Sequence, residues 1–223
     1  MKELFKFLKE LRENNNREWF MANKSRYDAL YKEHLGIVEQ LIAGISTFDP
    51  EIAGLEAKSC VYRIYRDIRF SNDKTPYKTH FGAYMTGFGG RTSPYGGYYL
   101  HIEPDNSLVS GGVWCPTPEM LKSLRRDIYN NIDEFIGILE NKEFKKVYNK
   151  LEGETLKRMP DGFPKDCEYD YILKQKMFIV TQNKPENFFY KDNWIDEVIE
   201  NFRLLYPFNK FLNYTIGEFF KKG

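Results

Sequence analysis

The spacing of apolar residues changes twice along this 223-residue chain, and these two changes constrain the fold more than any other feature. In residues 1–48 apolar side chains recur at helical intervals, whereas residues 57–114 hold short β-branched and aromatic runs broken by Gly, Pro, Asn and Asp. Helical spacing returns in residues 117–223, together with one further strand. The pattern predicts a single α+β domain over residues 1–223, in which a central, mainly antiparallel sheet is flanked by N-terminal, middle and C-terminal helices.

Local signals place the individual elements. A first helix ends before Asn14, and Asn16 is the expected N-cap of a longer second helix, which stops at Pro50 because proline cannot continue it. Thr117 is the expected N-cap of a middle helix, with a break near Asn130. Further helices are expected over residues 144–151 and, divided at Tyr206-Pro207, over residues 194–219. Strands are expected near residues 57–66, 79–87, 96–103, 107–114 and 176–181.

Positive charge is concentrated in one segment. The chain carries 33 Lys and Arg against 32 Asp and Glu, so its net charge of +1 gives little attraction for nucleic acid or for an anionic membrane. Residues 58–78 hold six basic residues against two acidic ones, a net charge of +4 that leaves −3 for the remainder. An unpaired buried charge is costly, so this local patch in aromatic and apolar surroundings favours a small anionic ligand over a long polyanion.

This segment supplies the candidate site residues. Guanidinium groups match phosphate and carboxylate geometry with paired donors, lysines add point charges, and a tyrosine adds a hydroxyl. The predicted ligand-binding residues are Arg63, Arg66, Arg69, Lys74, Tyr77 and Lys78. Asp67 and His80 are candidate catalytic residues, because either can move a proton once neighbouring charge has tuned its pKa. The sequence leaves the reaction, the cofactor and the ligand's identity open.

The geometry of this segment decides whether the arginines can act together. If residues 57–70 formed one strand, Arg63 and Arg66 would face opposite sides of the sheet. A turn near Asp67 would instead bring Arg66 and Arg69 to the side of Arg63. A helix also fits the apolar spacing, but the excess of β-branched and aromatic residues favours a strand followed by a turn.

Two other functions compete with a ligand site. In the first, Arg66 and Asp67 pair with acids such as Glu103 or Glu119 in an internal ion-pair network, and the protein is a structural or protein-interaction domain. In the second, aromatic residues interleaved with the basic ones stack the bases of a single-stranded nucleic acid. The near-neutral total charge makes nucleic acid the weakest of the three interpretations.

Metal and cofactor motifs are missing from the sequence. Its three cysteines are far apart and form no CxxC pair, so neither a disulfide nor structural zinc is expected. His80 and His101 could meet Cys115 or Glu103 around an ion, but strand histidines are more often simply packed, and no metal is predicted. Phosphate-binding loops, dinucleotide fingerprints, nucleophile elbows and zinc-protease motifs do not occur.

The sequence also favours a cytoplasmic protein without a membrane partner. The N-terminal residues lack the uncharged apolar stretch of a signal peptide, and no run of 18 apolar residues occurs. The oligomeric state is left open.

One long motif and several short ones carry a resemblance to a known family. The long motif is RIYRDIRFSNDKTPYKTH at residues 63–80. The short ones lie at residues 16–20, 96–99, 112–116 and 156–162, and at Lys176. Together they resemble the pattern of an uncharacterised bacterial and fungal family, the domain of unknown function 2461, over nearly the whole chain. The resemblance implies the same domain but no activity, cofactor or catalytic residue.

Overall fold

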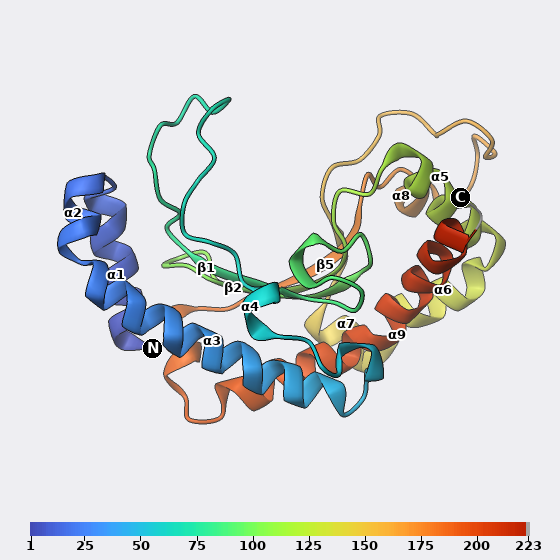
Figure 1. The fold of residues 1–223 in the computed structure, drawn as a ribbon. Helices are drawn as coiled ribbons and strands as arrows, with labels where there is room; N and C mark the ends of the chain where they lie inside the picture. Colours follow the sequence, from blue (N-terminus) through green and yellow to red (C-terminus); the bar gives the residue numbers. More distant parts are fainter. Residues whose placement is uncertain (222–223) are drawn as a thin grey trace.

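The computed structural model describes residues 1–221 of the protein. Its centre is a five-stranded antiparallel sheet with the strand order β1-β2-β3-β5-β4 (Figure 1). The strands are β1 (Phe81–Met85), β2 (Gly97–Ile102), β3 (Leu108–Val113), β4 (Leu151–Glu152) and β5 (Phe178–Asn183). Helices before, between and after the strands confirm the predicted α+β class. Four of the five expected strands are present: β1, β2 and β3 are shorter than expected, and β5 is shifted by two residues.

The α-helices within the described residues are α1 (Lys2–Glu13), α2 (Arg17–Ala22), α3 (Lys24–Ser46), α4 (Ala57–Cys60), α5 (Pro118–Asn130), α6 (Ile132–Leu139), α7 (Lys142–Val147), α8 (Asp170–Leu173) and α9 (Trp194–Lys221). Short 3₁₀ turns lie at Pro50–Ile52, Gly90–Thr92 and Glu186–Tyr190. The side chains of Asn16 and Thr117 cap α2 and α5 as predicted. Within residues 1–221, none of these helices combines the length and the apolar character needed to cross a membrane.

Two long helices cover one face of the sheet. α3 and α9 pack against each other and against the strands (Figure 1). The residues that β2 directs to this face, Tyr98, Leu100 and Ile102, are completely shielded from solvent. Tyr98 donates its hydroxyl to the carboxylate of Asp49 at 2.8 Å, and its ring lies 5.3 Å from that of Phe202 in α9. We call this the core face.

The other face of the sheet has no helix over it in the described part of the chain (Figure 1). α1 and α2 stand beside it at one side, and α5 and α8 at the other (Figure 1). Residues 66–76, which we call the arm, project on this same side of the sheet (Figure 1). We call this second face the open face, because side chains on it can meet a ligand without displacing a helix.

The predicted strand over residues 57–66 is wrong. Ala57–Cys60 is a helical turn, and the residues that follow are extended but pair with β1 only through the isolated bridge of Val61 with Ala83. The N–H of Arg66 donates to the carbonyl of Pro76 at 2.9 Å. Proline has no N–H with which to return a bond, so regular pairing stops at this point and the arm begins.

The long N-terminal helix expected after Asn16 is divided in two. α2 ends at Ala22 and α3 begins at Lys24. Between them, the side-chain amide of Asn23 donates to the carbonyl of Trp19 at 3.0 Å. Asparagine side chains compete in this way with the backbone bonds of a helix, which accounts for the break.

The expected division at Pro207 is also wrong, because α9 continues through this residue. Proline removes one backbone hydrogen bond, a cost of about 3 kcal/mol in a helix interior. Leu205 and Phe208 on either side of it are fully buried, and their packing offsets that cost. By contrast, the break near Asn130 is confirmed, and the helix expected over residues 144–151 ends earlier, at Val147.

Candidate functional site

A row of hydroxyl groups crosses the open face. In the antiparallel register, Tyr84 of β1 faces Tyr99 of β2, Tyr99 faces Ser110 of β3, and Ser110 faces Thr181 of β5. Successive residues of a strand point to opposite faces, so the immediate neighbours of these four residues turn toward the core. The row therefore spans four strands on the face that no described helix covers.

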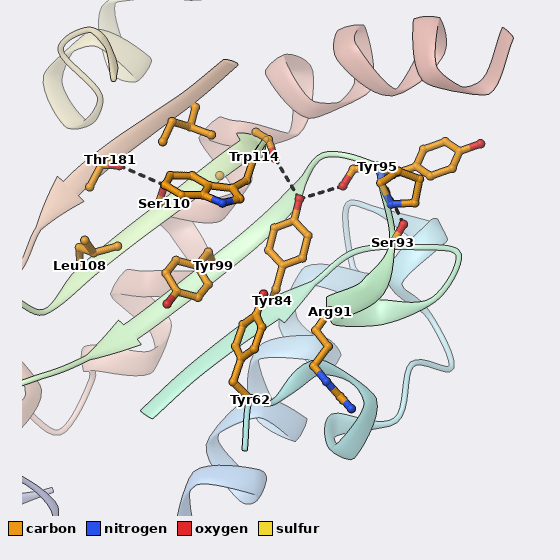
Figure 2. Close-up of a pocket in the computed structure, with 14 residues that line it drawn as sticks. Tyr62, Tyr84, Arg91, Ser93, Tyr95, Tyr99, Leu108, Ser110, Trp114 and Thr181 are labelled. Carbon is orange, nitrogen blue, oxygen red and sulfur yellow. Dashed lines mark hydrogen bonds between the residues drawn. The ribbon is translucent and has the colours of Figure 1, made fainter. Parts of the chain in front are cut away.

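A cavity of about 450 Å³ lies over this row (Figure 2). Its lining is predominantly aromatic, and Figure 2 shows the tyrosine and tryptophan rings gathered on one side of the sheet. Trp114, which directly follows β3, is 65% exposed and borders the opening. The lining residues used below are Tyr62, Tyr84, Arg91, Tyr95, Tyr99 and Trp114.

Hydrogen bonds to the protein fix the floor of the cavity. The hydroxyl of Tyr84 lies 2.8 Å from the carbonyl of Tyr95 and 3.0 Å from that of Gly112, and can donate to either. Ser110 Oγ donates to a backbone carbonyl at 2.7 Å and accepts from Thr181 Oγ1 at 3.1 Å. Burial raises the pKa of the Tyr84 hydroxyl, so it remains a neutral donor at physiological pH.

One cation, Arg91, lines the cavity, and the charges of Arg91 and Arg63 both act on nearby Lys78. Lys78 Nζ lies 5.1 Å from the centre of the Tyr62 ring, and Arg91 lines the cavity while donating to two backbone carbonyls of α4. Burial, followed by the charges of Arg63 and Arg91, lowers the pKa of the Lys78 ammonium. Within residues 1–221, neither Arg63 nor Lys78 forms an ion pair with a carboxylate.

Two histidines and a glutamate adjoin the cavity beyond Tyr99. Nδ1 of His101 lies 2.7 Å from Tyr99 Oη, and Nε2 of His101 lies 3.1 Å from Glu103 Oε2. His80 directly precedes β1, and its ring centre lies 4.3 Å from that of His101. Burial lowers the pKa of His80 to about 4 and also lowers the pKa of His101. Both imidazoles are therefore neutral at physiological pH.

Glu103 is held by three neighbours. The hydroxyl of Thr79 donates to Oε1 at 2.7 Å, and the side-chain amide of Asn106 donates to Oε2 at 2.9 Å. Burial alone would raise the pKa of Glu103, but these bonds and His101 bring it below its ordinary value. The ionised carboxylate, the imidazole of His101 and the hydroxyl of Tyr99 form a hydrogen-bonded chain that could hold a proton. Among the described residues, His80, His101 and Glu103 are the group whose ligand atoms come close enough to hold a metal ion.

The predicted arginines of the arm are paired locally. Arg66 Nη1 forms an ion pair with Asp73 and donates to the carbonyl of Thr75 at 3.1 Å. Arg69 forms an ion pair with Asp67 at 2.6 Å, and both side chains are exposed. The chain does turn after Asp67, but both arginines pair with carboxylates of the arm itself, Arg66 with Asp73 and Arg69 with Asp67.

Two further predicted residues are also occupied elsewhere. Lys74 donates to the carbonyl of Ile68 on the arm at 3.0 Å. Tyr77 is buried in the core, where its ring stacks on Phe20 with 4.0 Å between ring centres. None of the six predicted ligand-binding residues lines the cavity; Lys78 lies against the lining residue Tyr62, and Arg63 is near enough for its charge to act on Lys78.

The two candidate catalytic residues also lie in different parts of the structure. His80 lies in the polar cluster beside the cavity, whereas Asp67 lies on the arm. Sequence reasoning missed Arg91 and Trp114, whose positions depend on how two loops return to the sheet. The sequence does contain a signal for Tyr99, His101 and Glu103. They are spaced two residues apart, and residues with this spacing on a strand point to the same face of the sheet.

Comparison with known proteins gives a single result. No match was found among curated proteins or among solved structures. A family described as "Conserved hypothetical protein (DUF2461)" matches residues 3–211, from α1 into α9. The matched region includes the arm, every strand of the sheet and the whole lining of the cavity. The chain belongs to this family of conserved hypothetical proteins, DUF2461.

Proposed function

We propose that the protein binds a small molecule in which a phosphate or carboxylate is joined to a flat apolar ring, and that the molecule occupies the cavity over the open face. The anionic group meets Arg63, Lys78 and Arg91, and the ring lies among the aromatic side chains. One observation carries this proposal. Within residues 1–221, Arg91 lines an aromatic cavity, the charges of Arg63 and Arg91 act on nearby Lys78, and neither Arg63 nor Lys78 forms an ion pair with a carboxylate.

Electrostatics favour an anion at this position. Lys78 is only partly exposed, and two guanidinium charges act on it. Repulsion between like charges is stronger near a protein surface than in bulk water. An anion placed between the cations replaces this repulsion with charge-assisted hydrogen bonds, and the guanidinium groups can offer paired donors to its oxygens.

The remainder of the cavity suits a ring. Tyr62 and Tyr99 meet edge to face with 6.3 Å between ring centres, and the exposed indole of Trp114 borders the opening. Aromatic contacts of this kind contribute about 0.5–1.5 kcal/mol beyond the area that they bury. The cavity volume of about 450 Å³ falls within the range of roughly 300–1,000 Å³ that is usual for small-molecule sites.

The charges of the arm stay outside the proposed site. Arg66 and Arg69 are neutralised by Asp73 and Asp67, so they offer an anion less than the unpaired cations of the sheet do. These pairs support a structural role for the arm itself. In the described chain they do not reach Glu103, which is occupied by other partners.

A thermal-shift titration tests the proposal with three probes at constant ionic strength: phenyl phosphate, inorganic phosphate and benzyl alcohol. Phenyl phosphate should raise the melting temperature most, because it alone carries both the anion and the ring. A ligand at a hundred times its Kd stabilises the folded state by about 2.7 kcal/mol, which is a readily measured shift. EDTA in every sample excludes any contribution from metal ions.

Matched variants locate the binding site. Arg63→Gln and Lys78→Gln should each abolish the phenyl phosphate shift. Arg69→Gln removes the same charge from the arm and should leave the shift unchanged. The proposal fails if none of the probes stabilises the protein, or if Arg69→Gln removes the shift as completely as Arg63→Gln does.

A further inference from the structure

We propose that His80, His101 and Glu103 form a binding site for a divalent transition-metal ion at the edge of the open-face cavity. The three side chains offer two imidazole nitrogens and one carboxylate oxygen, and these ligand atoms lie within 4.8 Å of one another. The site differs from the proposed anion site in both residues and charge. The inference therefore does not rest on the proposed anion binding.

The strand register brings the three ligands together. Phe81 faces Ile102 across β1 and β2, so the preceding His80 comes opposite Glu103. His101 and Glu103 are two residues apart, and the pleat of a strand directs such residues to the same face. The ligands thus converge through backbone pairing, which is a more rigid support than a loop.

The distance between two of the ligand atoms fits a shared ion. His101 Nε2 lies 3.1 Å from Glu103 Oε2. Two ligands bound at roughly 2.0–2.1 Å to a tetrahedral ion lie about 3.3 Å apart. An ion between them thus requires only a small outward shift. The ring of His80 lies beside that of His101, and rotation of its side chain can supply the third ligand.

Neighbouring hydrogen bonds orient these ligands. Tyr99 Oη lies against Nδ1 of His101, which leaves Nε2 directed at the cluster. The hydroxyl of Thr79 holds Oε1 of Glu103, which leaves Oε2 directed at the same point. Metal-binding imidazoles usually engage a second partner through their other nitrogen, and ligating carboxylates are likewise hydrogen-bonded. His101 and Glu103 each have this outer support.

The choice of ligands indicates the class of ion. Two imidazoles and one carboxylate suit zinc and other first-row divalent metals, and three protein ligands leave positions open for water or a ligand. Lys78 is near enough for its charge to act on His80, and this repulsion opposes a bare cation, whereas the ionised Glu103 attracts one. We expect an affinity weaker than that of a closed structural zinc site.

Metal binding changes the position of one proton. Without an ion, Nε2–H of His101 donates to Glu103, and Nδ1 accepts from the hydroxyl of Tyr99. With an ion on Nε2, the proton lies on Nδ1 and is donated to Tyr99 Oη. The imidazole remains neutral and no proton is released from it. Nitrogen-15 NMR distinguishes the two tautomers, so this change can be measured in the unsubstituted protein.

The direct test is a Co²⁺ titration of protein that has been freed of metal by EDTA and dialysis. One equivalent of Co²⁺ per chain should produce visible absorption bands, and Zn²⁺ should displace it. Zn²⁺ should also raise the melting temperature and move the His101 proton from Nε2 to Nδ1. If the unsubstituted protein shows neither saturable Co²⁺ bands nor a tautomer change with Zn²⁺, the proposed metal site does not exist.

Variants assign the ligands. His80→Gln, His101→Gln and Glu103→Gln should each weaken Co²⁺ binding by more than about 100-fold, the upper end of what loss of an outer partner costs. Thr79→Val removes such an outer partner and should weaken binding by about 10-fold. Asp105→Asn and Cys115→Ser are the controls, because each removes an exposed residue of a ligand type that lies outside the cluster. Equal Co²⁺ affinity in Glu103→Gln and Asp105→Asn would overturn the assignment.

Discussion

The two faces of the sheet use neighbouring residues of the same strands for different purposes. On the core face, Tyr98 is completely buried between the sheet and α9, and its hydroxyl is bound to Asp49. One residue later on β2, Tyr99 faces the cavity and contacts His101. The core face brings together apolar side chains, whereas the open face brings together hydroxyls, imidazoles and cations.

The comparison indicates that, along one strand, the residues that stabilise the fold can differ from those that line a possible ligand site. Residues at alternate positions of β2 contribute to one or the other, because the pleat directs them to opposite faces. Substitutions on the core face should therefore affect folding, and substitutions on the open face should affect binding. The predictions below test this separation, beginning with the largest expected effect.

The sharpest test replaces two adjacent tyrosines. Tyr98→Ala should destabilise the protein by about 3–5 kcal/mol, because it leaves a cavity in the core and removes the partner of Asp49. Tyr99→Ala should cost only about 1–2 kcal/mol, since its ring borders a cavity that is already open. Urea unfolding of both variants measures the difference. Equal losses would show that the open face is as important for folding as the core face.

A second test uses the pH dependence of stability. His34 of α3 lies on the core face beside Phe81, with 5.1 Å between ring centres. Neither ring nitrogen forms a well-aligned hydrogen bond in the described chain, although the backbone of Gly82 lies close enough to favour protonation slightly. Burial lowers the pKa of His34 to about 4, from an ordinary value near 6.5.

Because the folded state disfavours the charged ring, its stability is complete above pH 6.5 and falls as the pH decreases toward 4. The loss from His34 alone should reach about 3 kcal/mol. His34→Gln should remove this part of the slope. The part that remains reports on His80 and His101, whose pKa values are also lowered, and below about pH 5 on carboxyls such as Glu103 as well. Urea unfolding between pH 7 and pH 4 gives both slopes. An unchanged slope in His34→Gln would contradict the assignment.

The smallest effects should separate the cations of the arm from those of the open face. Arg66→Ala should destabilise the protein by about 1 kcal/mol or less, because it breaks a partly exposed ion pair with Asp73. Arg63→Gln should leave the stability of the ligand-free protein nearly unchanged, since it relieves the repulsion that acts on Lys78 but also removes an attraction to the exposed Asp67. Added salt should reduce both effects. A strongly destabilising Arg63→Gln would indicate that Arg63 has a structural partner.

The fold could be predicted where the periodicity of the sequence matched its tertiary environment. Short β-branched and aromatic runs bounded by turn residues predicted β2 and β3, and caps predicted the starts of α2 and α5. The errors occurred where packing outweighed a local signal. Pro207 normally ends a helix, but buried neighbours carry α9 through it. Pro76 interrupted a pairing that the aromatic residues had indicated.

The candidate site could be predicted only in part. The excess of cations led to the prediction of Arg63, Lys78 and His80, which lie near the cavity or beside residues that line it. The same reasoning could not decide which arginines would be neutralised. This depends on the path of the arm, which brings Asp67 and Asp73 within reach of Arg69 and Arg66. Arg91 joins the cavity from a loop whose path is set by contacts with α4, and no local pattern encodes that path.

The place of α9 in the chain also affects how the protein is made. Its residues complete the cover over the core face, yet they follow the end of β3 by roughly 100 positions, which ribosomes take about 5–20 s to add at 5–20 residues per second. During this interval, three paired strands present an incompletely covered apolar surface to solvent or to a chaperone. The core face can therefore be fully covered only after α9 has been synthesised, however fast this helix forms.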